Sequence, residues 1–198
     1  MMHQNEMQYQ QKLDLLFQRA FANASEAFRL FTGKPVQGGT PQYFFDKRSY
    51  IEEANQKTFH KHCLLVTKLI GEIEGRSFLL IPKQGCRELY TPLSDFKKEH
   101  VMLEFAKELD NILSAAVITE ITNILQLNLH GGVPDLNILS KLVIETFIEG
   151  FSSGNQDFFV STTFLVGNPS QQFQTQFLWQ FSENFLAKIA NTPLLSFN

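Results

Sequence analysis

The sequence predicts an α+β protein built from two copies of one unit, and three observations support this prediction. Two Gly-Gly-x-Pro segments, Gly38 to Pro41 and Gly131 to Pro134, lie 93 residues apart. Each segment follows a long helical pattern rich in Leu, Ala, Phe or Ile. Each is followed, after a variable stretch, by two strand-like runs and a helix. We therefore expect two pseudo-symmetric repeats.

The first copy begins with a predicted helix over residues 8–32. Two apolar runs, Cys63 to Ile73 and Ser77 to Ile81, read as strands, and the few residues between them, including Gly75, are short enough to form a hairpin. The pattern from Arg87 to Leu93 indicates a closing helix.

The second copy repeats this order, beginning with a helix over residues 101–126. Its strands are predicted from Asp157 to Val166 and from Gln174 to Phe181, with a Gly-Asn-Pro turn between them. Ser182 is expected to cap a closing helix from Glu183 to Ala190.

Two further segments are assigned less simply. Tyr43 to Lys57 reads as an inserted loop or a short helix, and Asn137 to Gly150 reads as a helix that ends at glycine. No linker rich in Pro, Gly or Ser divides the chain. We therefore expect a single domain over 1–198, with repeat one at about 8–95 and repeat two at about 101–198.

Composition excludes several classes of function. The net charge of -3 comes without a run of basic residues, so no nucleic-acid partner is expected. No apolar stretch approaches the roughly 20 residues that span a bilayer, and the polar start indicates a cytoplasmic protein with no membrane partner. Cys63 and Cys86 are expected to be buried thiols, and the 20 phenylalanines are expected to pack the core.

One motif on the second long helix points to chemistry. Glu108 and Asn111 are three residues apart, and 22 residues separate Asn111 from Pro134. A Glu-x-x-Asn pair alone carries little information. The two other pairs in the chain have no proline at this spacing: Glu52/Asn55 and Glu120/Asn123.

The helical repeat places Glu108 and Asn111 on one stripe with Glu104, Ala115 and Thr122. The opposite side is apolar, so this stripe is expected to face outward. The plain alternative is a solvated helix face. Glu120 projects toward the apolar side, and the sequence gives no reason for it.

This motif resembles the signature of the CheC, CheX and FliY phosphatases of bacterial chemotaxis. Ile121 to Leu125 is similar to a Leu-Ser-x-Leu-Leu type segment of that family, and Gly71 to Gly75 resembles its glycine-flanked hairpin. The resemblance covers most of the chain, and the duplicated layout is more like CheC than the shorter CheX.

The resemblance implies a fold with two long helices packed beside an antiparallel sheet. It also implies hydrolysis of the aspartyl phosphate of a CheY-like receiver domain, with Asn111 orienting the attacking water and Glu108 engaging a lysine of the receiver. Pro134 would shape the neighbouring loop. The protein would need no cofactor of its own, since Mg²⁺ is held by the receiver. A CheD-type protein is a further expected partner.

The chain departs from the family pattern at two places. Glu104 stands where the family has Asp or Ser. In the first copy, Leu15 and Gln18 occupy the positions of the glutamate and the asparagine, and 22 residues separate Gln18 from Pro41. Because leucine cannot pair with a lysine, we expect the first copy to be inactive.

Other kinds of site have weaker support. His60 and His62 lie two apart but lack further ligands at a metal-site spacing, so no metal is expected. No serine lies in a Gly-x-Ser-x-Gly pattern, and no phosphate-binding glycine loop is present. The alternative function is a binding module of the same fold that docks a receiver or a CheD-type partner without hydrolysis.

Overall fold

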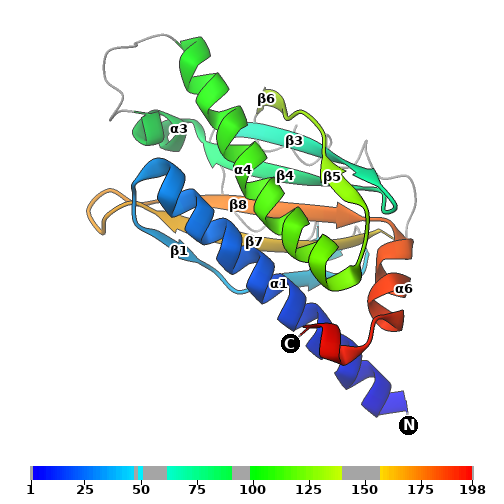
Figure 1. Cartoon of the computed structure of the whole chain (residues 1–198). Helices are drawn as coiled ribbons and strands as arrows, with labels where there is room; N and C mark the ends of the chain where they lie inside the picture. Colours follow the sequence, from blue (N-terminus) through cyan, green and yellow to red (C-terminus); the bar gives the residue numbers. More distant parts are fainter. Residues whose placement is uncertain (1, 47–48, 51–61, 91–98, 140–156, 198) are drawn as a thin grey trace.

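The computed structural model describes residues 2–46, 49–50, 62–90, 99–139 and 157–197 (Figure 1). Its helices are α1 (Met2–Thr32), α3 (Lys83–Tyr90), α4 (Glu99–Leu125), α6 (Glu183–Asn191) and the 3-10 helix η2 (Leu194–Phe197). Its strands are β1 (Val36–Gly38), β2 (Gln42–Phe44), β3 (His62–Gly71), β4 (Gly75–Pro82), β5 (Leu129–Gly131), β6 (Asp135–Leu139), β7 (Phe158–Val166) and β8 (Phe173–Phe181).

The strands in the described residues form one antiparallel sheet with the order β1-β7-β8-β4-β3-β5. The short strand β2 also pairs with β7, and β6 also pairs with β3. The two long helices α1 and α4 lie beside each other across one face of this sheet (Figure 1). The predicted α+β architecture is confirmed.

The strand register is the same in the two halves of the sheet. Gly38 of β1 pairs with Phe164 of β7, and Gly131 of β5 pairs with Leu69 of β3. Gly131 lies 93 residues after Gly38, and Leu69 lies 95 residues before Phe164, so the repeat relates one pair to the other. Phe78 pairs with Leu178 where β4 meets β8, at the centre of this symmetry. Because the edge strands of each copy pair with the other copy's inner strand, the two repeats build one interlocked sheet.

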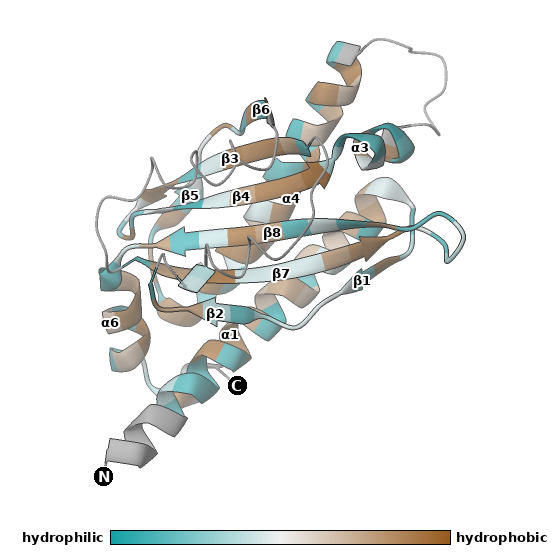
Figure 2. Cartoon of the chain, turned by 180° about the vertical axis from the view of Figure 1, so that it is seen from behind, coloured by the Kyte–Doolittle hydropathy of each residue, from teal (hydrophilic) through white to brown (hydrophobic). Residues whose placement is uncertain are grey.

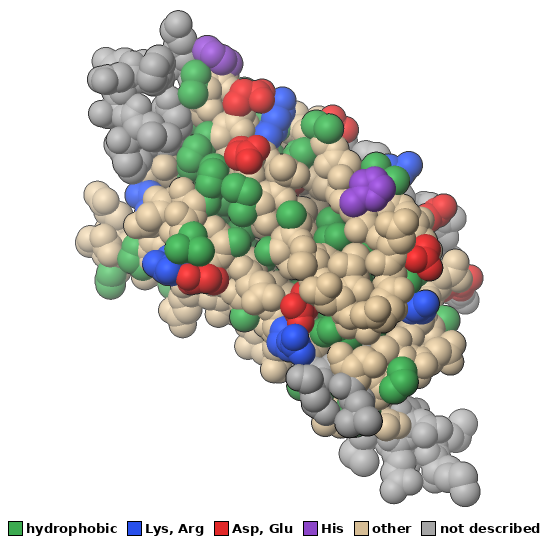
Figure 3. Space-filling model, in the orientation of Figure 1, with side chains coloured by type: hydrophobic (Ala, Val, Ile, Leu, Met, Phe, Trp, Pro, Cys, Tyr) green, Lys and Arg blue, Asp and Glu red, His purple; other side chains and the backbone are tan. Residues whose placement is uncertain are grey.

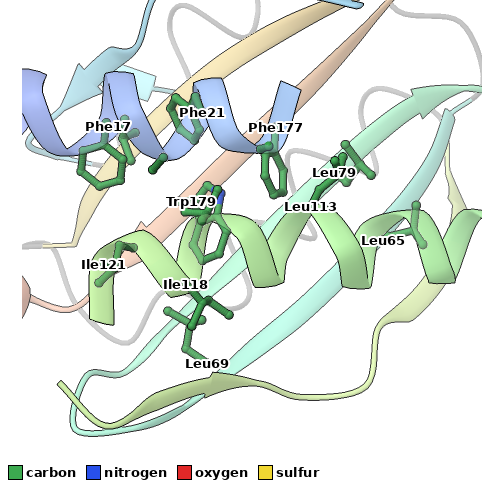
Figure 4. Packing of buried hydrophobic residues seen from close by; sticks show 14 of the residues in the cluster. Phe17, Phe21, Leu65, Leu69, Leu79, Leu113, Ile118, Ile121, Phe177 and Trp179 are labelled. Atoms are coloured by element: carbon green, nitrogen blue, oxygen red, sulfur yellow. The ribbon is translucent and has the colours of Figure 1, made fainter. Parts of the chain in front are cut away.

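The main core lies between the two long helices and the sheet. Figure 4 shows Phe17 and Phe21 of α1 and Leu113 of α4 packed around Phe177 and Trp179 of β8. All five side chains are buried. The prediction that the aromatic residues serve packing is confirmed for this cluster, in which burial of each large side chain contributes about 1.5–3 kcal/mol.

The opposite face of the sheet is also apolar. Figure 2 views the sheet from the side turned away from α1 and α4, and much of β3 and β4 is coloured as hydrophobic there. A second cluster of buried residues forms there, and it consists of Phe44, Tyr50, Leu64, Val66, Phe78, Leu80, Phe159 and Leu178. Burial on both faces explains why β3 and β4 read as continuous apolar runs rather than alternating ones.

The helix predicted from Asn137 to Gly150 is wrong at its start. Residues 137–139 belong to strand β6, in which Asn137 pairs with Leu64 of β3. The pairing partner is distant in sequence, so local pattern could not reveal it. Residues 140–150 lie outside the described part of the chain.

Three smaller differences concern element boundaries. The helix expected from Arg87 begins earlier, at Lys83, and residues 91–93 lie outside the described part. Within the segment 43–57, residues 43 and 44 belong to β2, whereas 47–48 and 51–57 are not described. Ser182 stands at the N-cap of α6 as expected, but its side chain makes no capping hydrogen bond.

Cys63 and Cys86 are buried thiols, as expected. A hydrogen bond between them, together with burial, raises the pKa of Cys86 and keeps it protonated at neutral pH. In the described ranges, no helix has the length and apolar character needed to cross a bilayer.

The two long helices end at equivalent positions with different residues. The backbone turns left-handed at Gly33 after α1, with φ of 65°, and at Gln126 after α4, with φ of 52°. The amide of Gly33 donates to the carbonyl of Arg29 at 2.9 Å, which closes the last turn.

Replacing Gln126 with glycine should stabilise the protein. In the left-handed conformation, a residue with a Cβ is destabilised by about 1 kcal/mol relative to glycine, which adopts this conformation without strain. We expect Gln126→Gly to raise the free energy of unfolding by about 0.5–1 kcal/mol, measured by urea denaturation. Gly33→Ala is the reciprocal control and should lower it; a fall with Gln126→Gly would contradict the argument.

Candidate functional site

The outward face of α4 carries the predicted residues. Glu104, Glu108, Asn111 and Ala115 are exposed, and Thr122 is half-buried. Side chains three or four positions apart on a helix are neighbours, with Cβ atoms about 5–6 Å apart. Glu108 and Asn111 therefore present a carboxylate and a carboxamide side by side to the solvent.

Glu104 is engaged within the helix. Its Oε1 atom lies 2.9 Å from the ammonium group of Lys107, and the Glu104 side chain is 67% exposed. Figure 3 shows acidic side chains and a basic one close together over the upper part of α4. The lysine offsets the charge of Glu104 locally, which reduces the repulsion that a longer carboxylate would bring to a phosphate.

The loop from Gly131 to Pro134 lies beside this helix. A Cβ at Gly131 would stand 3.3 Å from Ile118 of α4 and 3.2 Å from Thr67 of β3, so the loop backbone packs against both elements. The amide of Gly132 donates to the carbonyl of Lys68 at 2.8 Å. Pro134 is buried, and the side chain before it, Val133, is 86% exposed.

A buried polar cluster lies under the motif. Thr67 donates a hydrogen bond to Oδ2 of Asp110 at 2.6 Å, and the hydroxyls of Ser77 and Ser114 lie 2.9 Å apart. Thr67 and Ser77 are direct partners in the β3–β4 ladder, which joins the two pairs. Oδ1 of Asp110 is buried and has no hydrogen-bond partner among the described residues.

The environment of Asp110 changes its titration. Burial raises the pKa of Asp110 from its ordinary value of 3.8 to about 7, although the hydrogen bond from Thr67 acts in the opposite direction. A carboxyl group on the inner side of the motif helix therefore changes charge near neutral pH.

Glu120 has a clear structural role. Its carboxylate lies 2.7 Å from Nε of Arg19 and accepts a hydrogen bond from Asn23 at 3.1 Å, and both partners belong to α1. The side chain of Glu120 is only 8% exposed. This explains a carboxylate on the apolar side of α4, and it means that the pair Glu120/Asn123 cannot present its acid to a partner. The pair Glu52/Asn55 lies outside the described residues.

The first copy presents a different face at the equivalent positions. Leu15 is half-buried and packs against the main core, whereas Gln18 is exposed on α1. The carboxamide at this position is thus accessible, but no acid accompanies it one turn earlier.

Among the described residues, no group of His, Cys, Asp and Glu is arranged to hold a metal ion. His62 is buried in strand β3, and His60 lies outside the described part.

Sequence reasoning missed Asp110 and its partners. Asp110 occupies a buried position in a run of otherwise apolar residues on the inner side of α4: Ala106, Leu113, Val117 and Ile121. A single acid in such a run is the signal that was available, because a buried carboxylate needs a partner. The partner Thr67 is 43 residues away, so its identity required the tertiary structure.

No protein-family model matches the chain, and no curated protein sequence matches it. Solved structures are similar to it at low identity. FliY from Thermotoga maritima is 12% identical with a TM-score of 0.66, over 91% of this chain and 93% of that chain. A chain of a FliG–FliM complex from H. pylori is 8% identical with a TM-score of 0.61, over 90% of this chain and 97% of that chain.

A complex of CheX with CheY, BeF3 and Mg²⁺ from Borrelia burgdorferi is also similar to this chain. It is 12% identical with a TM-score of 0.55, over 84% of this chain and 97% of that chain. The expected fold is therefore confirmed: the chain has the fold shared by the FliY, CheX and FliM structures.

Proposed function

We propose that this chain binds a phosphorylated CheY-like receiver domain and hydrolyses its aspartyl phosphate, with Glu108 and Asn111 as the catalytic pair. The observation that carries the proposal is the joint exposure of these two side chains on one face of α4. The fold shared with a CheX that was solved in complex with CheY supports the class of partner.

The chemistry suits a carboxamide. An aspartyl phosphate is an activated acyl phosphate, and the receiver would hold it against Mg²⁺, so the helper protein has only to place a water in line with phosphorus. The Asn111 carboxamide donates and accepts hydrogen bonds and adds no negative charge near the phosphoryl oxygens. The water attacks phosphorus, the bond from phosphorus to the aspartyl oxygen breaks to restore the aspartate carboxylate, and inorganic phosphate leaves as the water's proton passes to solvent.

Glu108 would set the docking register. Its carboxylate lies one turn before Asn111 and is exposed, so it can form a charge-assisted contact with a lysine ammonium of the receiver. Such a contact fixes the distance between Asn111 and the phosphoryl group. Pro134 would act through the loop, because it is buried and anchors the segment that displays Val133.

A non-catalytic docking module is the second candidate. The fold shared with a chain of a FliG–FliM complex supports it, as does the glutamate at position 104, where the resemblance expects Asp or Ser. A module of this kind would bind a receiver or a CheD-type protein through the same face without turnover.

The decay of a phosphorylated receiver distinguishes the two candidates. The receiver is phosphorylated with acetyl phosphate, the donor is removed, and phosphate release is followed with and without this chain. We expect the chain to accelerate release at least tenfold. Binding without acceleration would favour the docking module, and neither binding nor acceleration would reject both candidates.

Val133 should contribute to binding rather than to chemistry. Its side chain is 86% exposed in the loop that packs against α4 at Gly131, and the equivalent position in the first copy is Thr40. If the docked receiver buries the Val133 side chain, exchanging one of its methyl groups for a hydroxyl weakens binding by about 1 kcal/mol, or about fivefold in affinity. We expect Val133→Thr to raise KM for the phosphorylated receiver about fivefold with little change in kcat.

The reciprocal exchange Thr40→Val is the matched control and should leave KM unchanged. An unchanged KM with Val133→Thr would place the receiver elsewhere on the surface.

A further inference from the structure

We propose that the hydrogen bond between Asp110 and Thr67 is a positioning element, which fixes the turn of α4 that carries Asn111 relative to the loop from Gly131 to Pro134. The inference rests on the proposed function and names two residues that act through Asn111 rather than on the substrate.

Thr67 contacts both parts that must be aligned. Its hydroxyl donates to Asp110 at 2.6 Å, and Asp110 directly precedes Asn111 on α4. Its methyl group lies 3.2 Å from where a Cβ on Gly131 would stand, so the same residue supports the start of the loop. The helix turn that carries Asn111 and the start of the loop therefore both contact the side chain of Thr67 in β3.

A hydrogen bond adds what apolar contacts at this interface lack. Apart from the contact between the hydroxyls of Ser77 and Ser114, the neighbouring contacts of α4 with the sheet are made by apolar residues such as Leu109, which tolerate small shifts and rotations. A hydrogen bond at 2.6 Å is directional and fixes the rotation of the helix about its axis at one residue. Because Asn111 is the next residue, its orientation follows directly.

The symmetry-related half of the fold, which combines α1 of the first copy with β7 of the second, provides an internal comparison. Its equivalent of Asp110 is Phe17, a fully buried core residue, and its equivalent of Thr67 is Thr162, 95 residues later in the same strand register. Thr162 donates instead to the carbonyl of Gly39 in its own loop, at 2.9 Å. The fold therefore accepts an apolar residue on the helix, and the hydrogen bond from Thr67 to the helix is found in the half of the fold that carries Glu108 and Asn111.

The presence of Asp110 at a buried position lowers the stability of the folded protein. Its carboxyl group is fully buried, and Oδ1 has no partner among the described residues. Burial raises the pKa of the group, which reflects the cost of holding the charged form inside the protein. A residue that is unfavourable for the fold, present beside the motif and replaced by phenylalanine in the other copy, is best explained by a demand of the site.

The test removes the hydrogen bond with a nearly isosteric change. Thr67→Val deletes the hydroxyl, Thr67→Ser retains it, and Thr162→Val makes the same change at the symmetry-related position, in the half of the fold that carries Gln18. Asp110→Leu removes the bond from the helix side and serves if Thr67→Val fails to fold. Single-turnover dephosphorylation of the phosphorylated receiver gives the rate at saturation and the saturation constant, and NMR follows the side-chain amide signals of Asn111.

We expect Thr67→Val to lower the saturating rate at least tenfold and to change the saturation constant less than twofold, because a small misplacement of a positioning group costs rate. Thr67→Ser should recover most of the rate, and Thr162→Val should match the wild type. The Asn111 amide signals should shift in Thr67→Val and Asp110→Leu and remain in place in Thr162→Val.

The outcomes separate this inference from the proposed function. If the wild type accelerates dephosphorylation and Thr67→Val does so equally, the positioning role is wrong and the phosphatase stands. If the wild type shows no acceleration, the proposed function fails, and the NMR result alone decides: unshifted Asn111 signals overturn the positioning role, whereas shifts confined to Thr67→Val and Asp110→Leu support it.

Discussion

Asn111→Ala is expected to reduce the rate of receiver dephosphorylation by on the order of 100-fold while leaving binding intact, because positioning a water is the step that a truncated side chain cannot perform. Asn111 is exposed, so its removal leaves no cavity and no buried partner unsatisfied. The measurement is phosphate release from the phosphorylated receiver at saturating concentrations of each variant, with affinity determined in parallel.

Gln18→Ala is the matched control for this experiment. Gln18 is the exposed carboxamide at the equivalent position of α1, and its neighbour at the acid position is Leu15. Its removal should leave the rate unchanged. Equal losses in both variants would indicate two working sites, and an unchanged rate in Asn111→Ala would remove Asn111 from the mechanism.

The sequence predicted the architecture well where the pattern is local or repeated. The two Gly-Gly-x-Pro segments fixed the repeat, and the structure places Gly38 and Gly131 at equivalent positions of the sheet. The long strands β3, β4, β7 and β8 were found because each carries its own apolar run. The short strands β1, β2, β5 and β6 were missed, since each is held by pairing with a distant strand and has little pattern of its own.

The site was predictable only in its outer layer. Helical spacing is enough to place Glu108 and Asn111 on one exposed face, because that geometry is fixed by the helix itself. The support beneath that face depends on contacts between elements. Asp110 meets Thr67, and Glu120 meets Arg19 of the other long helix, and neither partner is within reach of a local pattern.

The free energy of unfolding should fall as pH rises through the neutral range, and Asp110 should account for a large part of that fall. Its pKa is about 7 in the folded protein, raised from 3.8 by burial. Between these two values the folded state holds a proton that the unfolded state has released, so stability falls with increasing pH by about 1.4 kcal/mol per unit. The stabilisation is complete below the unfolded value and is lost above about pH 7.

The difference between the wild type and Asp110→Asn isolates this contribution, because the other titrating groups are common to both proteins. In urea denaturation, we expect the free energy of unfolding of the wild type to fall relative to Asp110→Asn by about 2.5 kcal/mol between pH 5 and pH 8. The hydrogen bond from Thr67 lowers the pKa of Asp110, so Thr67→Val should move the same fall to higher pH. If the stability of the wild type and of Asp110→Asn varies in parallel with pH, Asp110 is ionised throughout this range, and water or a rearranged neighbour stabilises its charge.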